Sequence, residues 1–370
     1  MALRTIRLRL DGTAAADRSY EIVVGRGAIA TLGPTLAAAS ARRGVVVADA
    51  AVAATHAATA VASLEAAGID AAALAVPSGE ASKSVAEAAR LWGEFARLAV
   101  DRRTHVVAVG GGVVGDLAGF VAATFARGLP VWQVPTTIVA QVDSAIGGKT
   151  GINLDAGKNL VGGFWQPRGV IADIDTLATL PAREFRSGLA EVVKYGVILD
   201  AEFFAWLEAH AAAIRERDPE SLQHIVERSA SLKAHVVERD EHETSGLRAV
   251  LNYGHTFGHA FETAAGYGTL LHGEAVAMGM TAAAQLAALL GRIGPDFINR
   301  QDALLRALGL PVTAADLAWT PPAPDDLLTI MGRDKKTVDG RLRFVLPSRL
   351  GHVELVDDID AALVRRVLAS

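Results

Sequence analysis

The sequence contains no cysteine among its 370 residues. This absence excludes disulfide bonds, thiolate nucleophiles and every zinc site that is built on cysteine. A metal ion bound by this chain must therefore be held by histidine and carboxylate side chains.

An excess of positive charge is also missing, because 36 Lys and Arg stand against 41 Asp and Glu. The resulting net charge of −5 comes without a basic tail or stripe, so the electrostatics give no reason to expect a nucleic-acid partner. Any anionic ligand must be bound by local cations.

No hydrophobic run is long enough to predict a membrane span. The uncharged stretch 275–291 falls short of about 20 residues and includes Thr281 and Gln285, so we interpret it as a buried central helix. Residues 1–11 alternate apolar and polar side chains, which predicts a strand and lacks the apolar core of a signal peptide. We therefore expect a cytoplasmic protein with no membrane partner.

The composition is that of a folded globular protein, with 51% hydrophobic and 21% charged residues. A length of 370 residues exceeds the roughly 100–200 that are typical of one domain, which suggests two. We place the boundary near residue 180. The first domain is then an α/β domain over 1–180, and the second is a helical domain over 181–370.

The two halves differ in their hydrophobic patterns. The first half alternates short β-branched runs with alanine-rich helical stretches, a rhythm that predicts a parallel sheet covered by helices. These runs cover 45–49, 105–109 and 131–134. After about Pro181 the apolar spacing becomes 3.6 residues, which predicts helices. The expected helices include 202–217, 219–237 and 273–290.

A glycine cluster from Gly110 to Asp116 follows one of these strands and opens a helix. Its backbone amides could approach a pyrophosphate closely, and the helix N-terminus would favour the negative charge. Parallel sheets bind ligands beyond the carboxyl ends of their strands, so we expect the cluster, Asp49 and Thr136-Thr137 to converge. Asp49 is our candidate for the ribose, and a tight structural turn is the alternative explanation of the glycines.

Histidines supply the candidate metal ligands. His255 and His259 are four residues apart and would lie on one face of a helix. Position 256 is not the glutamate that a metalloprotease needs, which excludes a protease. His272 opens a later helix, and Glu191 lies on an earlier one. One glutamate and two histidines suit a catalytic Zn²⁺ with water or substrate completing its coordination, although single histidines are more often structural.

Positive side chains occur near the same segments. They are Lys149, Lys158, Lys194, Lys233 and Arg248. Such cations in a cleft would bind a phosphate and a carboxylate, whereas the alternative is a solvated surface charge. Lys149 and Lys158 lie in the glycine-rich segment 146–163, which we interpret as a loop close to a ligand. The segment Gly147–Thr150 lacks the first glycine of a P-loop, so a nucleotide triphosphatase is excluded.

Eight segments, taken in order, resemble the 3-dehydroquinate synthase family across nearly the whole chain. They are 77–83, 110–116, 135–137, 143–151, 157–162, 191–196, 248–259 and 272–274. The resemblance implies an N-terminal Rossmann-like parallel-sheet domain and a C-terminal all-helical domain. It also implies a phosphate-eliminating lyase of the shikimate pathway, which converts 3-deoxy-D-arabino-heptulosonate 7-phosphate to 3-dehydroquinate with transient use of NAD.

The resemblance further implies which residues form the sites. The metal, Zn²⁺ or Co²⁺, would be held by Glu191, His255 and His272. The residues implied for NAD are Asp49, Ser78, Glu80, Lys83, Gly111, Gly112, Val113, Asp116, Thr136, Thr137, Lys149, Lys158, Thr176 and Thr179. Those implied for catalysis and for the phosphorylated sugar acid are Asp143, Lys149, Asn159, Lys194, Lys233, Arg248, Asn252, His259 and Lys335 or Lys336. Arg127 matches a family arginine that reaches the neighbouring subunit's site, so we expect a homodimer.

Two other catalytic functions stay open, and a third possibility is a non-catalytic NAD-binding module, which would have no need of the metal triad. A paralogous sugar phosphate cyclase would share the NAD and metal sites, but Asn159, Arg248 and His259 agree with the dehydroquinate type. A metal-dependent polyol dehydrogenase would release NADH in stoichiometric amounts. Its substrates carry no phosphate, which would leave Lys149, Lys194 and Arg248 without a purpose.

Overall fold

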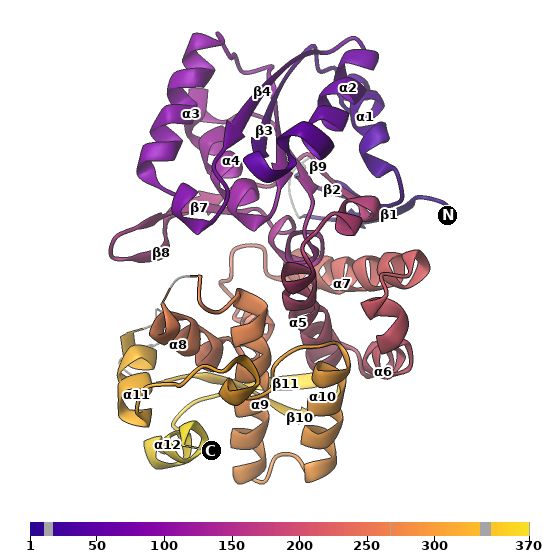
Figure 1. The fold of residues 1–370 in the computed structure, drawn as a ribbon. Coiled ribbons are helices and arrows are strands. Elements are labelled where there is room, and N and C mark those ends of the chain that lie inside the picture. Colours follow the sequence, from indigo (N-terminus) through magenta and orange to yellow (C-terminus); the bar gives the residue numbers. More distant parts are fainter. Residues whose placement is uncertain (11–17, 267, 334–341, 370) are drawn as a thin grey trace. The chain divides into compact units, whose positions relative to one another are not determined.

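The structure is a computed structural model that describes residues 1–10, 18–266, 268–333 and 342–369. Contacts divide the chain into two compact units (Figure 1). Unit 1 contains residues 1–180 and 222–242, and unit 2 contains 181–221 and 243–370. The division after residue 180 lies where the sequence pattern changes, but the grouping of 222–242 with unit 1 was not expected.

Unit 1 is built on a seven-stranded sheet in the order β1-β2-β9-β6-β5-β3-β4 (Figure 1). The strands are β1 (Arg4–Leu8), β2 (Tyr20–Gly25), β3 (Arg43–Asp49), β4 (Asp70–Val76), β5 (His105–Gly110), β6 (Val131–Pro135) and β9 (Gly169–Asp173). In the part of the chain that is described, β1 pairs with β2 in antiparallel fashion and the other pairings of this sheet are parallel. The predicted parallel sheet is confirmed, with the alternating N-terminal residues as an antiparallel edge.

Helices cover both faces of this sheet. They are α1 (Leu32–Ala38), α2 (Ala58–Ala66), α3 (Val85–Arg97) and α4 (Gly112–Thr124). Val45 and Val47 belong to the core beneath α3 and α4, whereas Val46 belongs to the core beneath α1 and α2. Because each face of the strand is buried against helices, β3 reads as a continuous apolar run instead of an alternating one.

The glycine-rich segment 146–163 is not the loop that the sequence predicted. Strands β7 (Lys149–Leu154) and β8 (Gly157–Phe164) pair here as an antiparallel hairpin. A Cβ on Gly162 would lie 2.1 Å from the carbonyl oxygen of Thr150, so a side chain does not fit at this position. At least this glycine therefore serves the close approach of two strands, which a pattern of loop-forming residues does not reveal.

Unit 2 is helical, as expected, with one antiparallel hairpin among its described residues. Its elements are α5 (Ala182–Leu199), α6 (Ala201–Arg215), α8 (His255–Ala265), α9 (His272–Leu289), α10 (Pro295–Ala307), α11 (Pro324–Arg333), α12 (Ala361–Leu368), β10 (Phe344–Arg349) and β11 (His352–Val356). Most of α7 (Pro219–Arg239) belongs to unit 1. The β10–β11 hairpin is an addition to the all-helical domain that the resemblance implied.

Helix α9 is the central helix of unit 2, as the uncharged stretch 275–291 predicted. Its residues are buried along most of its length, and α5, α8, α10, α12 and β10 pack around it. No described helix is both long enough and apolar enough to cross a membrane.

Two glycines let neighbouring segments approach α9 closely. A Cβ on Gly273 would lie 1.8 Å from the carbonyl oxygen of Ser187 on α5. A Cβ on Gly279 would lie 2.1 Å from the carbonyl oxygen of Gly254, directly before α8. These contacts leave no room for a side chain. The glycines therefore set how near groups on α5, α8 and α9 come to one another.

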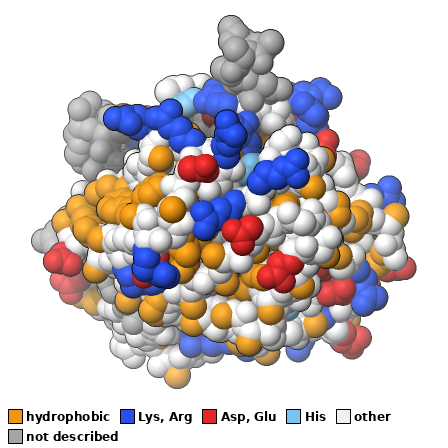
Figure 2. Space-filling view, turned by 90° about the horizontal axis from the view of Figure 1, so that it is seen from above, with side chains coloured by type: hydrophobic (Ala, Val, Ile, Leu, Met, Phe, Trp, Pro, Cys, Tyr) orange, Lys and Arg blue, Asp and Glu red, His pale blue; other side chains and the backbone are white. Residues whose placement is uncertain are grey.

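Charges of both signs are interspersed with apolar side chains on the face shown in Figure 2. Surface arginines commonly have acidic partners, such as Arg97 with Glu94 and Arg26 with Asp175. Exposed pairs of this kind contribute only about 0–1 kcal/mol each. Because such pairs are common on this surface, an arginine without an acidic neighbour stands out.

Candidate active site and metal centre

The ends of three parallel strands bring NAD candidates of unit 1 side by side. Asp49 ends β3, Gly110 ends β5, and the backbone N–H of Thr136 donates to the carbonyl oxygen of Gly110 at 2.9 Å. A Cβ on Gly110 would lie 3.2 Å from the Cβ of Asp49, and one on Gly111 would lie 3.3 Å from Thr137 Cγ2. This convergence follows from the parallel order of the sheet, as the sequence predicted.

The glycine cluster makes the turn from β5 into α4. Gly112 is the first residue of α4, and a Cβ there would lie 2.8 Å from Ser144 Oγ. Val113 follows in the first turn of the same helix. Exposed backbone N–H groups at a helix N-terminus suit a pyrophosphate, and the absence of side chains on Gly111 and Gly112 permits a close approach.

An ion pair of low exposure lies beside this turn. Lys83, which is 4% exposed, pairs with Asp116 in the second turn of α4. Burial raises the pKa of the Asp116 carboxyl above its usual value, and the attraction of Lys83 opposes that shift. Asn153 joins the group, because its side-chain amide donates to Glu80 Oε1 at 2.7 Å and its backbone N–H donates to the Lys83 carbonyl at 2.8 Å.

The other NAD candidates of unit 1 are also tied to strand ends. Ser78 Oγ donates to Asp49 Oδ1. Thr176 follows β9 and receives a hydrogen bond of 3.1 Å from Gln141 Nε2, while Thr179 Oγ1 donates to the Thr176 carbonyl at 2.9 Å. Gln141 was not predicted by the sequence. Its amide also reaches the carbonyl oxygen that ends β6, so it links two of these loops.

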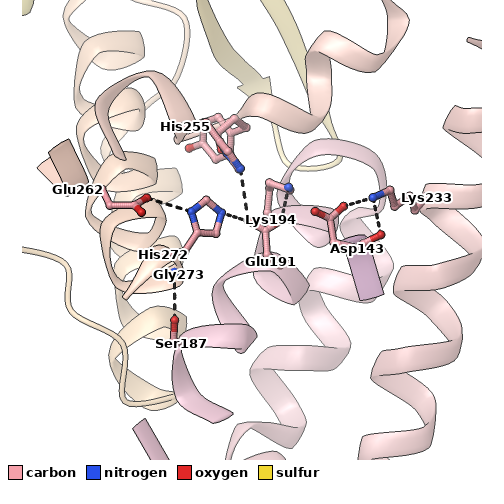
Figure 3. A network of polar contacts seen from close by, with 10 residues as sticks. Asp143, Ser187, Glu191, Lys194, Lys233, His255, Glu262, His272 and Gly273 are labelled. Atoms are coloured by element: carbon pink, nitrogen blue, oxygen red, sulfur yellow. Dashed lines mark hydrogen bonds and ion pairs between the residues drawn. The ribbon is translucent and has the colours of Figure 1, made fainter. Parts of the chain in front are cut away.

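The hairpin β7–β8 and α7 carry substrate candidates of unit 1. Lys149 begins β7, and Lys158 and Asn159 lie on β8. On α7, the nearly buried Lys233 donates from Nζ to both the backbone and the side-chain oxygen of Asp143 (Figure 3). The structure thus joins Asp143 and Lys233, which are far apart in the sequence.

Arg127 lies on unit 1, exposed after the end of α4. Its backbone has a left-handed φ of 66°, and it makes no hydrogen bond or ion pair with the residues that the structure describes. Lys335 and Lys336 lie outside the described residues.

In unit 2, the three predicted metal ligands come from three helices (Figure 3). Glu191 lies on α5 and is fully buried, His255 opens α8, and His272 opens α9. Glu191 Oε1 faces His255 Nε2 at 3.5 Å and His272 Nε2 at 3.6 Å, and one ligand atom of each residue lies within 4.8 Å of the others. Ligand atoms that bind Zn²⁺ tetrahedrally at about 2.0–2.1 Å are separated by about 3.3–3.4 Å. The triad therefore fits a divalent ion.

The other ring nitrogens of both histidines have partners that aim Nε2 at this point. His255 Nδ1 lies 3.0 Å from the carbonyl oxygen of Tyr253, and His272 Nδ1 lies 3.3 Å from Glu262 Oε2. Burial lowers the pKa of His272, but Glu191 and Glu262 outweigh it and raise the pKa to about 9. Metal binding would displace this proton.

The role of Glu262 was missed by the sequence interpretation. It lies on α8 seven residues after His255, which is two helical turns away and therefore on the same face. A carboxylate that orients a ligating imidazole is a recurrent feature of metal sites. The spacing from His255 was the signal that could have identified it.

Replacing Glu262 by alanine is expected to weaken metal binding by about 10–100-fold, because the His272 ring would lose the group that orients it. Titration of Zn²⁺ against a chelating dye would measure this change. Glu216→Ala, which removes an exposed carboxylate after α6, is the matched control. Equal zinc affinities of the Glu262→Ala and Glu216→Ala variants would contradict the proposed orientation.

The remaining candidates of unit 2 lie on α5 and around the start of α8. Lys194 is buried and ion-paired to Glu191. Arg248 is 1% exposed, with Nε 3.6 Å from Glu243 Oε1, and Asn252 ends the same short helix. The His259 ring lies 5.4 Å from the His255 ring between centroids, so the structure places it beside the triad.

Solved structures of similar fold include two synthases that contain NAD⁺ and a divalent metal ion. The 2-epi-5-epi-valiolone synthase of Streptomyces hygroscopicus, with NAD⁺ and Zn²⁺ bound, has a TM-score of 0.86 and 29% identity over 97% of this chain and 98% of its own. A 2-deoxy-scyllo-inosose synthase, complexed with carbaglucose-6-phosphate, NAD⁺ and Co²⁺, has a TM-score of 0.87 and 27% identity over 99% of both chains. This chain therefore shares the fold of these synthases and has a triad that fits a divalent ion.

Comparison of the sequence with known families identifies the family of this chain. Residues 73–187 match the family model described as 3-dehydroquinate synthase N-terminal, and residues 188–337 match the one described as 3-dehydroquinate synthase C-terminal. A 3-dehydroquinate synthase of Rhodopirellula baltica is 52% identical over 320 residues, which are 86% of this chain and 84% of that protein. The chain belongs to the 3-dehydroquinate synthase family.

Proposed function

We propose that this protein converts 3-deoxy-D-arabino-heptulosonate 7-phosphate to 3-dehydroquinate and inorganic phosphate in the shikimate pathway. The observation that carries the proposal is the triad of Glu191, His255 and His272 at the spacing of ion ligands, in a chain of this family. NAD would supply a hydride acceptor for the substrate and would return the hydride within the same turnover, so NADH should not accumulate. The overall reaction is that of a phosphate-eliminating lyase.

The triad holds one divalent metal, Zn²⁺ or Co²⁺. When bound there, such an ion supplies Lewis acidity toward the substrate hydroxyl that is to be oxidised. Glu262 and the Tyr253 carbonyl keep the two imidazoles aimed at the ion.

NAD binds at the carboxyl ends of the strands of unit 1, and its nicotinamide supplies the hydride acceptor. The N-terminus of α4 receives the pyrophosphate, with Gly111 and Gly112 allowing the backbone to approach. Asp49 binds the ribose. The other residues that we assign to the cofactor are Ser78, Glu80, Lys83, Val113, Asp116, Thr136, Thr137, Lys149, Lys158, Thr176 and Thr179.

Positive side chains bind the two anionic groups of the substrate. Lys149, Lys194 and Arg248 bind its phosphate and its carboxylate, because guanidinium and ammonium groups make strong charge-assisted hydrogen bonds to both. The other residues that we assign to the substrate are Asp143, Asn159, Lys233, Asn252, His259 and Lys335.

A direct test follows inorganic phosphate and NADH absorbance together, with 3-deoxy-D-arabino-heptulosonate 7-phosphate, NAD⁺ and Zn²⁺ supplied. We expect many equivalents of phosphate per enzyme and no accumulation of NADH, because the cofactor returns its hydride. Absence of phosphate release would refute the proposal. NADH accumulating from a simple polyol would instead support a dehydrogenase.

We also place the enzyme in the cytoplasm as a homodimer, in which Arg127 reaches the neighbouring subunit's site. The exposed side chain, which has no partner among the described residues, supports this role. Mixing Arg127→Ala with Glu191→Gln subunits is then expected to restore phosphate release that neither variant shows alone, since one hybrid site has both residues. Failure of the mixture to regain activity would contradict an exchange of Arg127 between subunits.

A further inference from the structure

A concave site lies within unit 2, at the first turns of α5 and α9 and the segment after α10. The cavity has a volume of about 400 Å³. Three arginines line it, and so do two acidic residues, Glu274 and Asp316. The arginines are Arg183, Arg186 and Arg306. None of these five residues is a candidate for the metal, the NAD or the substrate site.

The first carboxylate of this cavity is already engaged. Arg183 donates from Nε to Glu274 Oε1 and from Nη2 to Glu274 Oε2, each at 2.8 Å. Glu274 Oε2 also accepts the backbone N–H of Leu271 at 2.8 Å. The negative charge of Glu274 is therefore matched by one arginine and by the start of α9.

The second carboxylate is equally well supplied with donors. Asp316 Oδ1 accepts from Arg306 Nη1 at 3.0 Å, and Oδ2 accepts the backbone N–H groups of Val312 and Thr313, each at 2.9 Å. Burial works to raise the pKa of Asp316, but these donors outweigh it and lower the pKa to about 2. Asp316 is thus ionised at physiological pH and neutralises Arg306.

Arg186 remains as the positive charge that no acid balances. It is exposed and makes no hydrogen bond or ion pair with the residues that the structure describes. It lies three residues after Arg183 on α5, so the two guanidinium groups share one helix face, and Glu274 is hydrogen-bonded to Arg183. Its stem packs on Gly309, where a Cβ would lie 2.7 Å from Arg186 Cδ and φ is +77°. The aliphatic part of the Arg186 side chain is therefore held in place, and its guanidinium group is available to bind a ligand.

We propose that this cavity binds a small phosphate-type oxyanion, with Arg186 as its principal ligand. The charges lining the cavity, three positive and two negative, leave one positive charge. The planar guanidinium matches two oxygens of a phosphate, and Arg183 and Arg306 have further N–H donors beyond those that bind the carboxylates. The volume lies within the range of about 300–1,000 Å³ that is usual for small-molecule sites.

The test compares binding of inorganic phosphate to the full-length protein and to Arg186→Gln by calorimetry. The proposed catalytic site would also bind phosphate. Binding to the cavity is therefore measured as the difference in phosphate affinity between the two proteins. We expect Arg186→Gln to weaken one binding component at least about tenfold, as loss of a charged hydrogen bond predicts. The matched control is Arg366→Gln, which removes an exposed arginine of α12 outside this cavity and should bind as the unmodified protein does.

Two further readouts separate the possible sources and sites. Titration with glycerol phosphate distinguishes an organic phosphate from the inorganic ion. The ligand that the cavity prefers should lose more affinity when Arg186 is replaced by glutamine. In crystals soaked with selenate, an anomalous peak is expected beside Arg186 and not in Arg186→Gln. Phosphate release measured at low phosphate should stay unchanged in this variant, which keeps the proposed function separate. Identical isotherms for all proteins, or no selenate peak in the cavity, would overturn the proposal.

Discussion

Replacing Glu191 by glutamine is expected to abolish metal binding and to lower turnover at least about a thousandfold. The amide keeps the shape of the side chain but replaces the anionic ligand atom that faces both imidazoles at 3.5 and 3.6 Å. Lewis-acid stabilisation is worth several kcal/mol, and each 1.36 kcal/mol is about tenfold in rate. Metal content after dialysis and the rate of phosphate release would measure the two effects.

This substitution also acts on stability, because Glu191 pairs with the buried Lys194. An uncompensated buried charge typically destabilises by about 3–5 kcal/mol. The double variant Glu191→Gln/Lys194→Met removes both charges, so its urea midpoint should rise above that of Glu191→Gln while metal binding stays lost. A stable Glu191→Gln protein that retains its metal would contradict the assignment of Glu191 as a ligand.

Helical spacing predicts part of the metal triad. The spacing of four residues placed His255 and His259 on one face, and both do lie on α8. Spacing alone does not say that His255 meets Glu191 and His272 on two other helices. That meeting depends on the close packing of α9 at Gly273, which is a property of the tertiary structure. The resemblance to a family supplied what the local pattern could not.

The strands of unit 1 were predictable from their hydrophobic composition. Runs such as 45–49 are buried on both faces, so their composition alone identifies them. The hairpin at 149–164 was missed because glycine is usual in loops, whereas Gly162 serves a close strand pairing.

The grouping of 222–242 with unit 1 was equally invisible in the sequence. Helical periodicity identified most of α7, but not its partners. Those partners include the N-terminal segment, since Gln223 Nε2 donates to the carbonyl oxygen of Ala2 at 3.1 Å and the Arg9 N–H donates to Glu238 Oε1 at 2.6 Å. Contacts across more than 200 positions of the chain have no local signature.

Replacing Lys83 by methionine is expected to destabilise unit 1 by about 3–5 kcal/mol at neutral pH, because Asp116 would lose the cation that compensates its burial. The pKa of Asp116 is already raised by burial, and removal of Lys83 would raise it further. A carboxyl whose folded pKa exceeds its unfolded value of about 3.9 destabilises the fold as the pH rises through that window. The deficit of Lys83→Met should therefore be larger at pH 8 than at pH 5 in urea unfolding.

The double variant Lys83→Met/Asp116→Leu separates this ion pair's structural role from its proposed role in binding NAD. Without the carboxyl, the pH-dependent part of the deficit should disappear, since no buried charge remains to be compensated. NAD binding, measured by calorimetry, should be lost in the double variant, because both side chains that we assign to NAD are absent. Normal NAD binding by the double variant would show that the ion pair has only a structural role. Equal stability of Lys83→Met at both pH values would show that ionisation of Asp116 does not cause the deficit.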